Sequence, residues 1–329
     1  MSTILVTGGA GYIGSHVVRQ LGEHRERLVT LDNLSSGYRS AVLYGEFIAG
    51  DTGDAALVAK TLREHRIDTV MHFAAHISVP ESVENPLKYY RNNTANTRTL
   101  LECSVAAGVR NFVFSSTAAV YGMPVRGIAS EDSPTEPINP YGRSKLMSEW
   151  MLRDVAAVAP MRYVALRYFN VAGADPGGRI GQATPEATHL IKVACEHVVG
   201  RREQIAIFGT DYETPDGTCI RDYIHVEDLA FAHLQALDYL RAGGDSTTLN
   251  CGYGQGFSVR QVLDEVARVA GGPLRITEAP RRAGDPACLV AAADRIRDVL
   301  SWTPRHRDLE GIIRSALGWE RRLLRQPMS

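Results

Sequence analysis

A tyrosine and a lysine stand four residues apart, at Tyr141 and Lys145, directly after the turn-forming pair Asn139-Pro140. On a helix this spacing places both side chains on one face, with their Cβ atoms about 5–6 Å apart. A free tyrosine has a pKa near ~10 and is a poor base at neutral pH. An ammonium beside it favours the phenolate and lowers that pKa. The pair therefore predicts a general base, Tyr141, that Lys145 activates.

A hydroxyl stands where it could assist this base. The apolar segment 112–115 reads as a buried strand and ends in Ser115-Ser116-Thr117. Catalytic groups of an open α/β sheet lie at the carboxyl ends of its strands. We therefore expect Thr117 to hydrogen-bond a substrate hydroxyl that Tyr141 deprotonates.

The N-terminal segment 3–14 predicts a nucleotide site. A short apolar run ends in Gly8, Gly11 and Gly14, and a helical pattern follows at once. Glycines allow a sharp turn and a close approach to a diphosphate, which binds the free N–H groups of the helix N-terminus. Asp32, at the end of the next strand, is placed to bind the adenosine ribose hydroxyls. Its charge repels a 2′-phosphate, and the nearest arginine is Arg39 in the following loop, so NAD is favoured over NADP.

Strands and helices alternate through the first half of the chain. Strands are predicted at 4–7, 28–31, 47–48, 69–73, 112–115 and 163–166, with helices at 13–23, 55–65, 90–107 and 141–158. This order predicts an α/β fold with a Rossmann-type, doubly wound parallel sheet. The strands are nearly all apolar, as burial on both faces requires.

The pattern changes after about residue 171. Residues 172–187 are rich in Gly, Pro, Ala and Asp and lose the regular alternation. Helices are expected at 189–199, from 226, after a capping box at Ser258 and Gln261, at 294–300 and at 308–324, with strands at 205–208, 248–250 and 274–277. We predict a NAD-binding domain over 1–170 and a smaller α/β substrate lobe over 171–329, with part of 222–252 returning to the large sheet.

Composition excludes several classes of function. The 329 residues are 44% hydrophobic and 22% charged with a net charge of −1, so no basic surface predicts a nucleic-acid partner. No run reaches the ~18 apolar residues of a membrane span, and the N-terminus does not read as a secretory signal. Five widely spaced cysteines favour reduced thiols in the cytoplasm. The ten histidines lack metal-ligand spacing, so no metal is expected.

Taken together, Gly8-x-x-Gly11-x-x-Gly14, Ser115-Ser116-Thr117 and Tyr141-x-x-x-Lys145 resemble the extended short-chain dehydrogenase/reductase superfamily. Within it, the chain is similar to the UDP-glucose 4-epimerase (UDP-galactose 4-epimerase) family. The similarity extends through 7–15, 32–34, 119–122, 140–147, 167–170, 200–202, 206–212, 217–218, 221–225 and 281–285.

The resemblance implies an isomerase that inverts carbon 4 of a UDP-hexose. Tyr141 removes the proton of the 4-hydroxyl while NAD takes the hydride, and the 4-keto sugar turns over before the hydride returns. Lys145 also binds the nicotinamide ribose. The resemblance further implies a homodimer formed by the helices predicted at 90–107 and 141–158.

The resemblance also assigns contacts by position. On the cofactor side it implies Gly8, Gly11, Tyr12, Ile13, Gly14, Asp32, Asn33, Asp51, Thr52, Phe73, Ala74, Ala75, Asn92, Ser115, Tyr141, Lys145 and Tyr168. On the substrate side it implies Thr117, Tyr141, Asn170, His189, Leu190, Ala206, Phe208, Arg221, Tyr223, Arg282, Asp285 and Leu289.

Some positions depart from the family pattern. Thr117 stands where many members have serine, and His189 where others often have asparagine. Ala75 and Ile77 replace the glycine and lysine of some members. Leu289 stands where tyrosine goes with a preference for UDP-glucose and UDP-galactose, whereas smaller residues go with acceptance of N-acetylated sugars. We therefore expect UDP-N-acetylhexosamines to be substrates too.

Three other functions compete with this one for the same residues. A 4,6-dehydratase carries an Asp-Glu pair just after the strand-end hydroxyl, and Ala118 and Ala119 cannot move protons there, so this class is excluded. An epimerase specific for another UDP-sugar, a pentose or a uronate, stays open. A NAD-bound scaffold without catalysis is disfavoured because Thr117, Tyr141 and Lys145 are all present.

Overall fold

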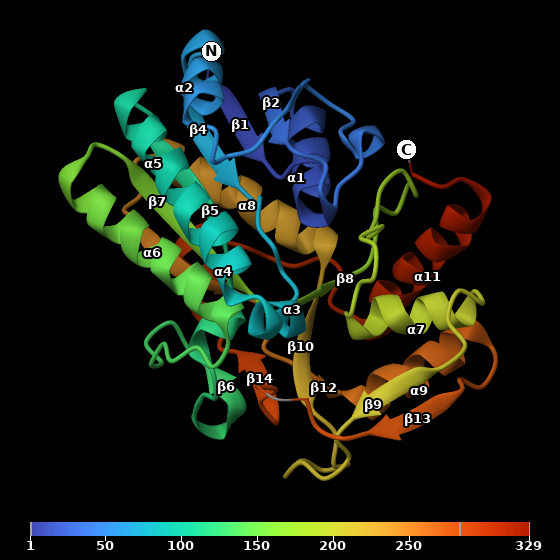
Figure 1. The fold of residues 1–329 in the computed structure, drawn as a ribbon. Helices are drawn as coiled ribbons and strands as arrows, with labels where there is room; N and C mark the ends of the chain where they lie inside the picture. The colour runs from blue at the N-terminus through green and yellow to red at the C-terminus, as the bar shows by residue number, and fades with distance from the viewer. Residues whose placement is uncertain (1, 283, 329) are drawn as a thin grey trace.

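A single large parallel sheet organises the fold. The computed structural model describes residues 2–282 and 284–328. Within them, seven parallel strands lie in the order β3-β2-β1-β4-β5-β7-β11 (Figure 1). Their bounds are β1 (Thr3–Thr7), β2 (Arg27–Asp32), β3 (Glu46–Ala49), β4 (Ile67–His72), β5 (Asn111–Thr117), β7 (Arg162–Tyr168) and β11 (Thr247–Cys251). The strand order reverses between β1 and β4, which is where open α/β sheets bind ligands.

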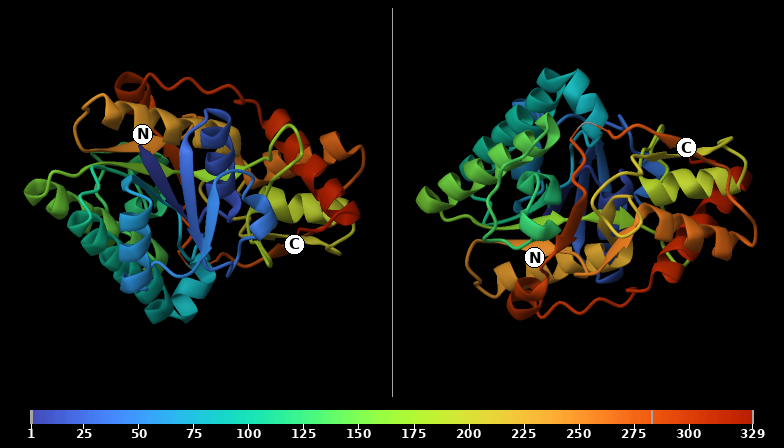
Figure 2. Two further views of the ribbon diagram at one scale, coloured as in Figure 1. Left: turned by 90° about the horizontal axis from the view of Figure 1, so that it is seen from above. Right: turned by 90° about the horizontal axis from the view of Figure 1, so that it is seen from below.

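Helices cover both faces of this sheet, as the two views in Figure 2 show. One face carries α1 (Tyr12–Glu23) and α8 (Val226–Arg241), and the other carries α2 (Ala55–Glu64), α5 (Asn96–Ala106) and α6 (Pro140–Val158). Neighbouring strand residues enter different cores: Val6 packs with the first set of helices and Leu5 with the second. Because side chains alternate across a strand, both faces need apolar residues. The predicted Rossmann-type fold is confirmed.

The helix predicted over 90–107 is more complex than expected. Two short helices, α3 (Val79–Glu84) and α4 (Pro86–Tyr89), lead into a π-helical turn at Tyr90–Ala95, and only then does α5 begin. Buried Asn93 lies in the π-helical turn. Its side chain accepts a hydrogen bond from the His76 amide (2.9 Å) and donates to the His76 carbonyl and to the Ser144 hydroxyl (3.0 Å each). The π-helical turn thus fixes the loop after β4 against α6.

A second lobe lies beside the carboxyl edge of the large sheet (Figure 1). Its strands form a small sheet in the order β12-β10-β14-β6, with β8 also paired to β10, and a separate pair β13-β9. Their bounds are β6 (Ile128–Ala129), β8 (Asn170–Ala172), β9 (Ile205–Phe208), β10 (Ile220–His225), β12 (Gly256–Ser258), β13 (Ile276–Ala279) and β14 (Cys288–Ala291). The helices that follow β8, apart from α8, are α7 (Leu190–Val198), α9 (Val259–Ala270), α10 (Asp294–Leu300) and α11 (Leu309–Arg325).

The chain crosses between the two lobes more than once. After β10 of the small sheet it forms α8 and β11 of the large one. β10 contains a buried aspartate, Asp222, which accepts hydrogen bonds from the amides of Tyr253, Gly254 and Ala291. The division at residue 170 stays a prediction. None of the helices in the described ranges is long and apolar enough to cross a membrane.

Candidate active site

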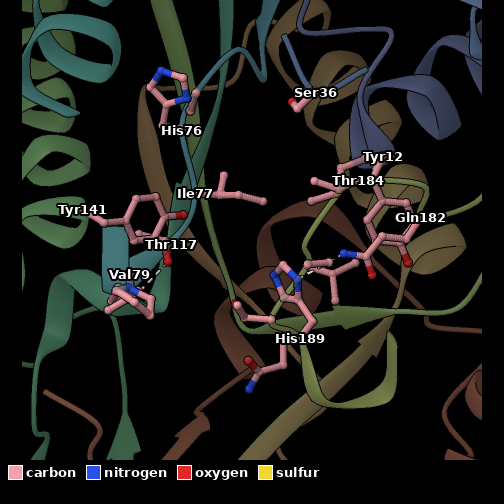
Figure 3. A pocket seen from close by; sticks show the side chains of 18 of the residues that line it. Tyr12, Ser36, His76, Ile77, Val79, Thr117, Tyr141, Gln182, Thr184 and His189 are labelled. Atoms are coloured by element: carbon pink, nitrogen blue, oxygen red, sulfur yellow. Dashed lines mark hydrogen bonds between the residues drawn. The ribbon is translucent and has the colours of Figure 1, made fainter. Parts of the chain in front are cut away.

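The carboxyl ends of the large sheet and the second lobe enclose one cavity of about 1040 Å³. This volume lies at the upper limit for small-molecule sites, so it has room for two ligands side by side. Figure 3 shows Tyr141 and Thr117 on one side of it, with Tyr12, Gln182 and His189 on the other. The cavity therefore joins the glycine turn after β1 to the second lobe.

The glycine turn is shaped to hold a dinucleotide diphosphate. A Cβ added at Gly8, where φ is +73°, would lie 2.5 Å from the backbone nitrogen of Ala74, and one at Gly14 would lie 2.2 Å from the Gly8 carbonyl oxygen. Side chains are therefore excluded from the turn. Gly11 is the N-cap of α1, whose first turn carries no acidic residue. The first amides of the helix are thus available to an anion.

Asp32 lies where a ribose would follow this diphosphate. The Ala10 amide donates to its Oδ2 (2.9 Å) and the Leu34 amide to its Oδ1 (2.8 Å), which fixes the carboxylate at the cavity wall. Burial raises the pKa of Asp32, while these two bonds oppose the shift. Arg39 does not line the cavity. Its guanidinium stacks on Phe47 instead, 4.8 Å from the centre of the ring. The carboxylate and the glycine turn together fit an adenosine ribose without a 2′-phosphate.

Tyr141 and Thr117 lie together at the candidate reactive centre of the cavity. The Asn139 side chain accepts a hydrogen bond from the Gly142 amide (2.8 Å) and starts α6, which places Tyr141 in its first turn. Thr117 ends β5, and its hydroxyl accepts a hydrogen bond from the Ala119 amide (3.1 Å). Burial raises the pKa of Tyr141, whereas a hydrogen bond with Thr117 lowers it. Base and hydroxyl are thus brought together.

Lys145 lies behind this centre. It is 2% exposed, and its ammonium donates to the Ser115 carbonyl (2.9 Å) and lies 4.9 Å from the centre of the Phe114 ring. Burial lowers the pKa of Lys145 to about 7, against the charge of Glu149. We expected Lys145 to lower the pKa of Tyr141. Among the protein's own groups burial dominates and raises the pKa of Tyr141, and a lysine with a pKa of about 7 carries only part of its charge at neutral pH. A lowered tyrosine pKa with the added charge of an oxidised nicotinamide stays a prediction.

Basic side chains gather at the second-lobe end. Arg221 lies 3.5 Å from the carboxylate of Asp285, and the guanidinium of Arg282 stacks 3.7 Å from the centre of the Phe208 ring. Leu289 lies opposite Arg221 on the neighbouring strand β14. All five side chains line the cavity. Arginines are suited to a diphosphate through charge-assisted, bidentate hydrogen bonds.

With the exception of Lys145, every site residue predicted from the sequence lines the cavity. Among the described residues, those lining residues are Gly8, Gly11, Tyr12, Ile13, Gly14, Asp32, Asn33, Asp51, Thr52, Phe73, Ala74, Ala75, Asn92, Ser115, Thr117, Tyr141, Tyr168, Asn170, His189, Leu190, Ala206, Phe208, Arg221, Tyr223, Arg282, Asp285 and Leu289.

Sequence reasoning missed several lining residues. Ser36, His76, Gln182 and Thr184 all line the cavity and are visible in Figure 3, and Arg202 lines it too. They lie in loops without periodicity. The available signals were the family resemblance over 200–202, which includes Arg202, and the polar character of Gln182 and Thr184 in a Gly- and Pro-rich segment. In the described part of the chain, no cluster of three or more His, Cys, Asp or Glu side chains could hold a metal ion.

Comparisons with known proteins agree with this geometry. The sequence model of the "NAD dependent epimerase/dehydratase family" matches residues 4–252. A UDP-glucose 4-epimerase of Azospirillum brasilense is 60% identical over 97% of this chain and 92% of its own length. The crystal structure of UDP-glucose 4-epimerase from Brucella ovis in complex with NAD superposes with a TM-score of 0.94 at 44% identity, over 97% of this chain and 99% of that one. The UDP-Glc/GlcNAc 4-epimerase of Campylobacter jejuni superposes with a TM-score of 0.85 at 49% identity, over 98% of this chain and 100% of that one.

Proposed function

Because the chain belongs to the NAD-dependent epimerase/dehydratase family, we infer that it is an isomerase that interconverts UDP-glucose and UDP-galactose by inverting carbon 4 of the hexose. The observation that carries this function is the pairing of Tyr141 with Thr117 in the cavity that also holds the glycine turn and Asp32. One cavity thus contains a base, a hydroxyl and a dinucleotide site.

NAD is the cofactor, and the protein's own groups fit it. The amides at the start of α1 would bind the diphosphate, and Asp32 the adenosine ribose. When bound, NAD supplies the hydride acceptor for carbon 4 and afterwards the hydride donor, so that it leaves each cycle unchanged. Asn33, Asp51 and Thr52 lie on the cavity wall beside Asp32 and complete the adenosine end.

Tyr141 is the candidate base for the proton of the sugar 4-hydroxyl. We propose that its phenolate accepts the proton of the sugar 4-hydroxyl and returns it after the ketone has turned over. Thr117 holds that hydroxyl in line. Since burial raises the pKa of Tyr141, the phenolate needs a cationic neighbour, and the charge of an oxidised nicotinamide is of the required sign. General base catalysis of this kind is worth about 10²–10⁴-fold.

Arg221 and Arg282 would hold the UDP diphosphate while the sugar reorients. Binding energy at the nucleotide can keep the ketone in the cavity, because it does not depend on which sugar face is presented. Leu289 borders the sugar in this arrangement. Its small, apolar side chain supports acceptance of UDP-N-acetylglucosamine and UDP-N-acetylgalactosamine as well, as does the likeness to the C. jejuni enzyme named for both glucose and N-acetylglucosamine.

We further propose that the enzyme is a cytoplasmic homodimer. Apolar side chains are exposed on α5 and α6, with Val158 at 88%, Trp150 at 46% and Val105 at 42%. A second copy packed on this face would bury them. All five cysteines carry free thiols, which fits a reducing compartment.

The function is tested by incubating the purified protein separately with UDP-glucose, UDP-galactose, both UDP-N-acetylhexosamines, a UDP-pentose and a UDP-uronate. Chromatography then follows both epimers. We expect both hexoses to reach the same equilibrium mixture. Turnover of the pentose or the uronate alone would assign a different substrate, and no turnover with NAD supplied would refute the function.

A further inference from the structure

His189 lies between a glutamine and the open centre of the cavity. The amide nitrogen of Gln182 and Nδ1 of His189 are 3.0 Å apart (Figure 3). Among the hydrogen bonds of the described residues, none uses Nε2 of His189. With the Gln182 amide in this orientation its nitrogen donates and Nδ1 accepts, which in a neutral imidazole places the proton on Nε2. The Nε2–H group of His189 is therefore available to donate to a ligand.

The surroundings keep this pair neutral and in place. Gln182 is 7% exposed. Its backbone carbonyl accepts a hydrogen bond from the Trp319 indole (3.1 Å), which fixes the backbone at this residue. Burial lowers the pKa of His189, and in the described part of the chain no charged group contributes to that shift. Arg202, which lines the same cavity, is paired with Glu196 of α7. The imidazole is therefore neutral at neutral pH.

The position of His189 indicates which ligand group would accept a hydrogen bond from Nε2. His189 is the N-cap of α7, whose first turn carries no acidic residue, so the helix end favours a negative charge. Arg221 and Arg282, which also belong to the second lobe, line the same cavity. An anionic oxygen bound by these groups is the natural acceptor for a neutral N–H donor.

We propose that Gln182 is a positioning residue that holds His189 in the Nε2–H tautomer, so that His189 donates a hydrogen bond to a phosphoryl oxygen of the UDP-sugar. The proposal rests on the proposed function for the identity of the ligand. The opposite tautomer would present a lone pair from Nε2 and repel that oxygen. Gln182 thereby determines whether the histidine attracts or repels the diphosphate.

Nitrogen NMR of the NAD-loaded full-length protein reads the tautomer directly. The His189 signals are assigned by their loss in His189→Asn. We expect a protonated Nε2 and an unprotonated Nδ1 in the wild type, with or without UDP. A protonated Nδ1 in the neutral ring would overturn the proposal, whatever the activity of the enzyme.

Gln182→Met has about the same length and cannot donate. We expect its Kd for UDP to rise about 10–100-fold, the usual range for one lost hydrogen bond to a charged group. The loss should appear in KM rather than in kcat. His189→Asn is the matched control, because an amide donates without needing a tautomer. In that background Gln182→Met should change the Kd by less than about twofold. Equal losses in both backgrounds would show that Gln182 merely packs.

Gln182→Glu provides a second signature. A carboxylate accepts the Nδ1 proton, so Nε2 donates only while the ring is an imidazolium. UDP affinity should then fall as pH rises through the pKa of this histidine, beyond any change in the wild type. An unaltered pH profile would contradict the proposal. Because UDP binding and NMR need no turnover, failure of epimerisation in the wild type would refute the proposed function separately.

Discussion

The ammonium of Lys145 donates a hydrogen bond to the carbonyl oxygen of Ser115, with 2.9 Å between the two atoms. Ser115 and Thr117 are two residues apart on β5, so their side chains point to the same face of the strand. The bond links α6 to β5 close to the point where Tyr141 of α6 lies beside Thr117 of β5. Lys145 is therefore placed to fix Tyr141 relative to Thr117 from behind the cavity wall.

Tyr141→Phe should keep the fold and the bound NAD but lower epimerase activity about 10²–10⁴-fold, because the base alone is lost. Activity is measured on UDP-galactose, and NAD is measured after denaturation. Thr117→Ser is the matched control, since it keeps the hydroxyl and should retain most of the activity. More than half of the wild-type activity in Tyr141→Phe would remove the tyrosine from the mechanism.

Lys145→Met should alter the pH dependence of stability. The pKa of Lys145 is about 7 in the folded protein and 10.5 as a free side chain, so between these values the unfolded state binds more protons. The wild type therefore gains unfolding free energy as pH rises from 7 towards 10, by up to about 1 kcal/mol per pH unit. The variant lacks this gain.

Urea titrations of both nucleotide-free proteins, repeated from pH 7 to about 10, measure the effect. We expect the stability of Lys145→Met relative to the wild type to be greatest near pH 7 and to decline as pH rises. Parallel curves would mean that the lysine keeps an ordinary pKa. In the same variant, loss of the bond to Ser115 should also reduce kcat.

Asp32→Ala should weaken NAD binding and relax discrimination against NADP. The variant removes both the acceptor for the ribose hydroxyls and the charge that repels a 2′-phosphate. Binding of each nucleotide to the nucleotide-free protein is compared by calorimetry. Asp32→Asn is the isosteric control that removes the charge and keeps one side-chain oxygen, which can accept from the Ala10 amide or the Leu34 amide but not from both. An unchanged NAD/NADP ratio in both variants would show that Asp32 does not contact the ribose.

Leu289→Tyr should suppress the reaction of N-acetylated sugars selectively. A bulkier side chain on β14 occupies the space that an acetamido group needs, and such size discrimination is worth about 1–3 kcal/mol. The measurement is kcat/KM on UDP-galactose and on UDP-N-acetylgalactosamine, with Leu289→Met as the volume-conserving control. Equal loss on both substrates would show that position 289 only packs the small sheet.

The sequence predicted the large sheet because its strands are apolar on both faces and its turns carry glycine at fixed positions. It did not predict β6, β8, β12 and β14, which have at most four residues each. It also missed β10, which contains buried Asp222, whose partners lie 31 to 69 residues away. Residues at strand ends, such as Thr117 and Asp32, could be located from local pattern. Gln182 could not, because its importance arises from a contact with His189 that only the folded loop creates. Lys145 was found by its spacing, but its burial and depressed pKa depend on the packing of α6 against β5.

The central claim is that the hydrogen on carbon 4 leaves and returns as a hydride without exchange with water. The most direct test uses UDP-galactose deuterated at carbon 4, incubated with the purified enzyme in ordinary water without added NAD. Proton NMR and mass spectrometry of the UDP-glucose formed then show where the label lies. We expect the deuterium to remain at carbon 4 of the product. Its replacement by hydrogen from water would contradict the account.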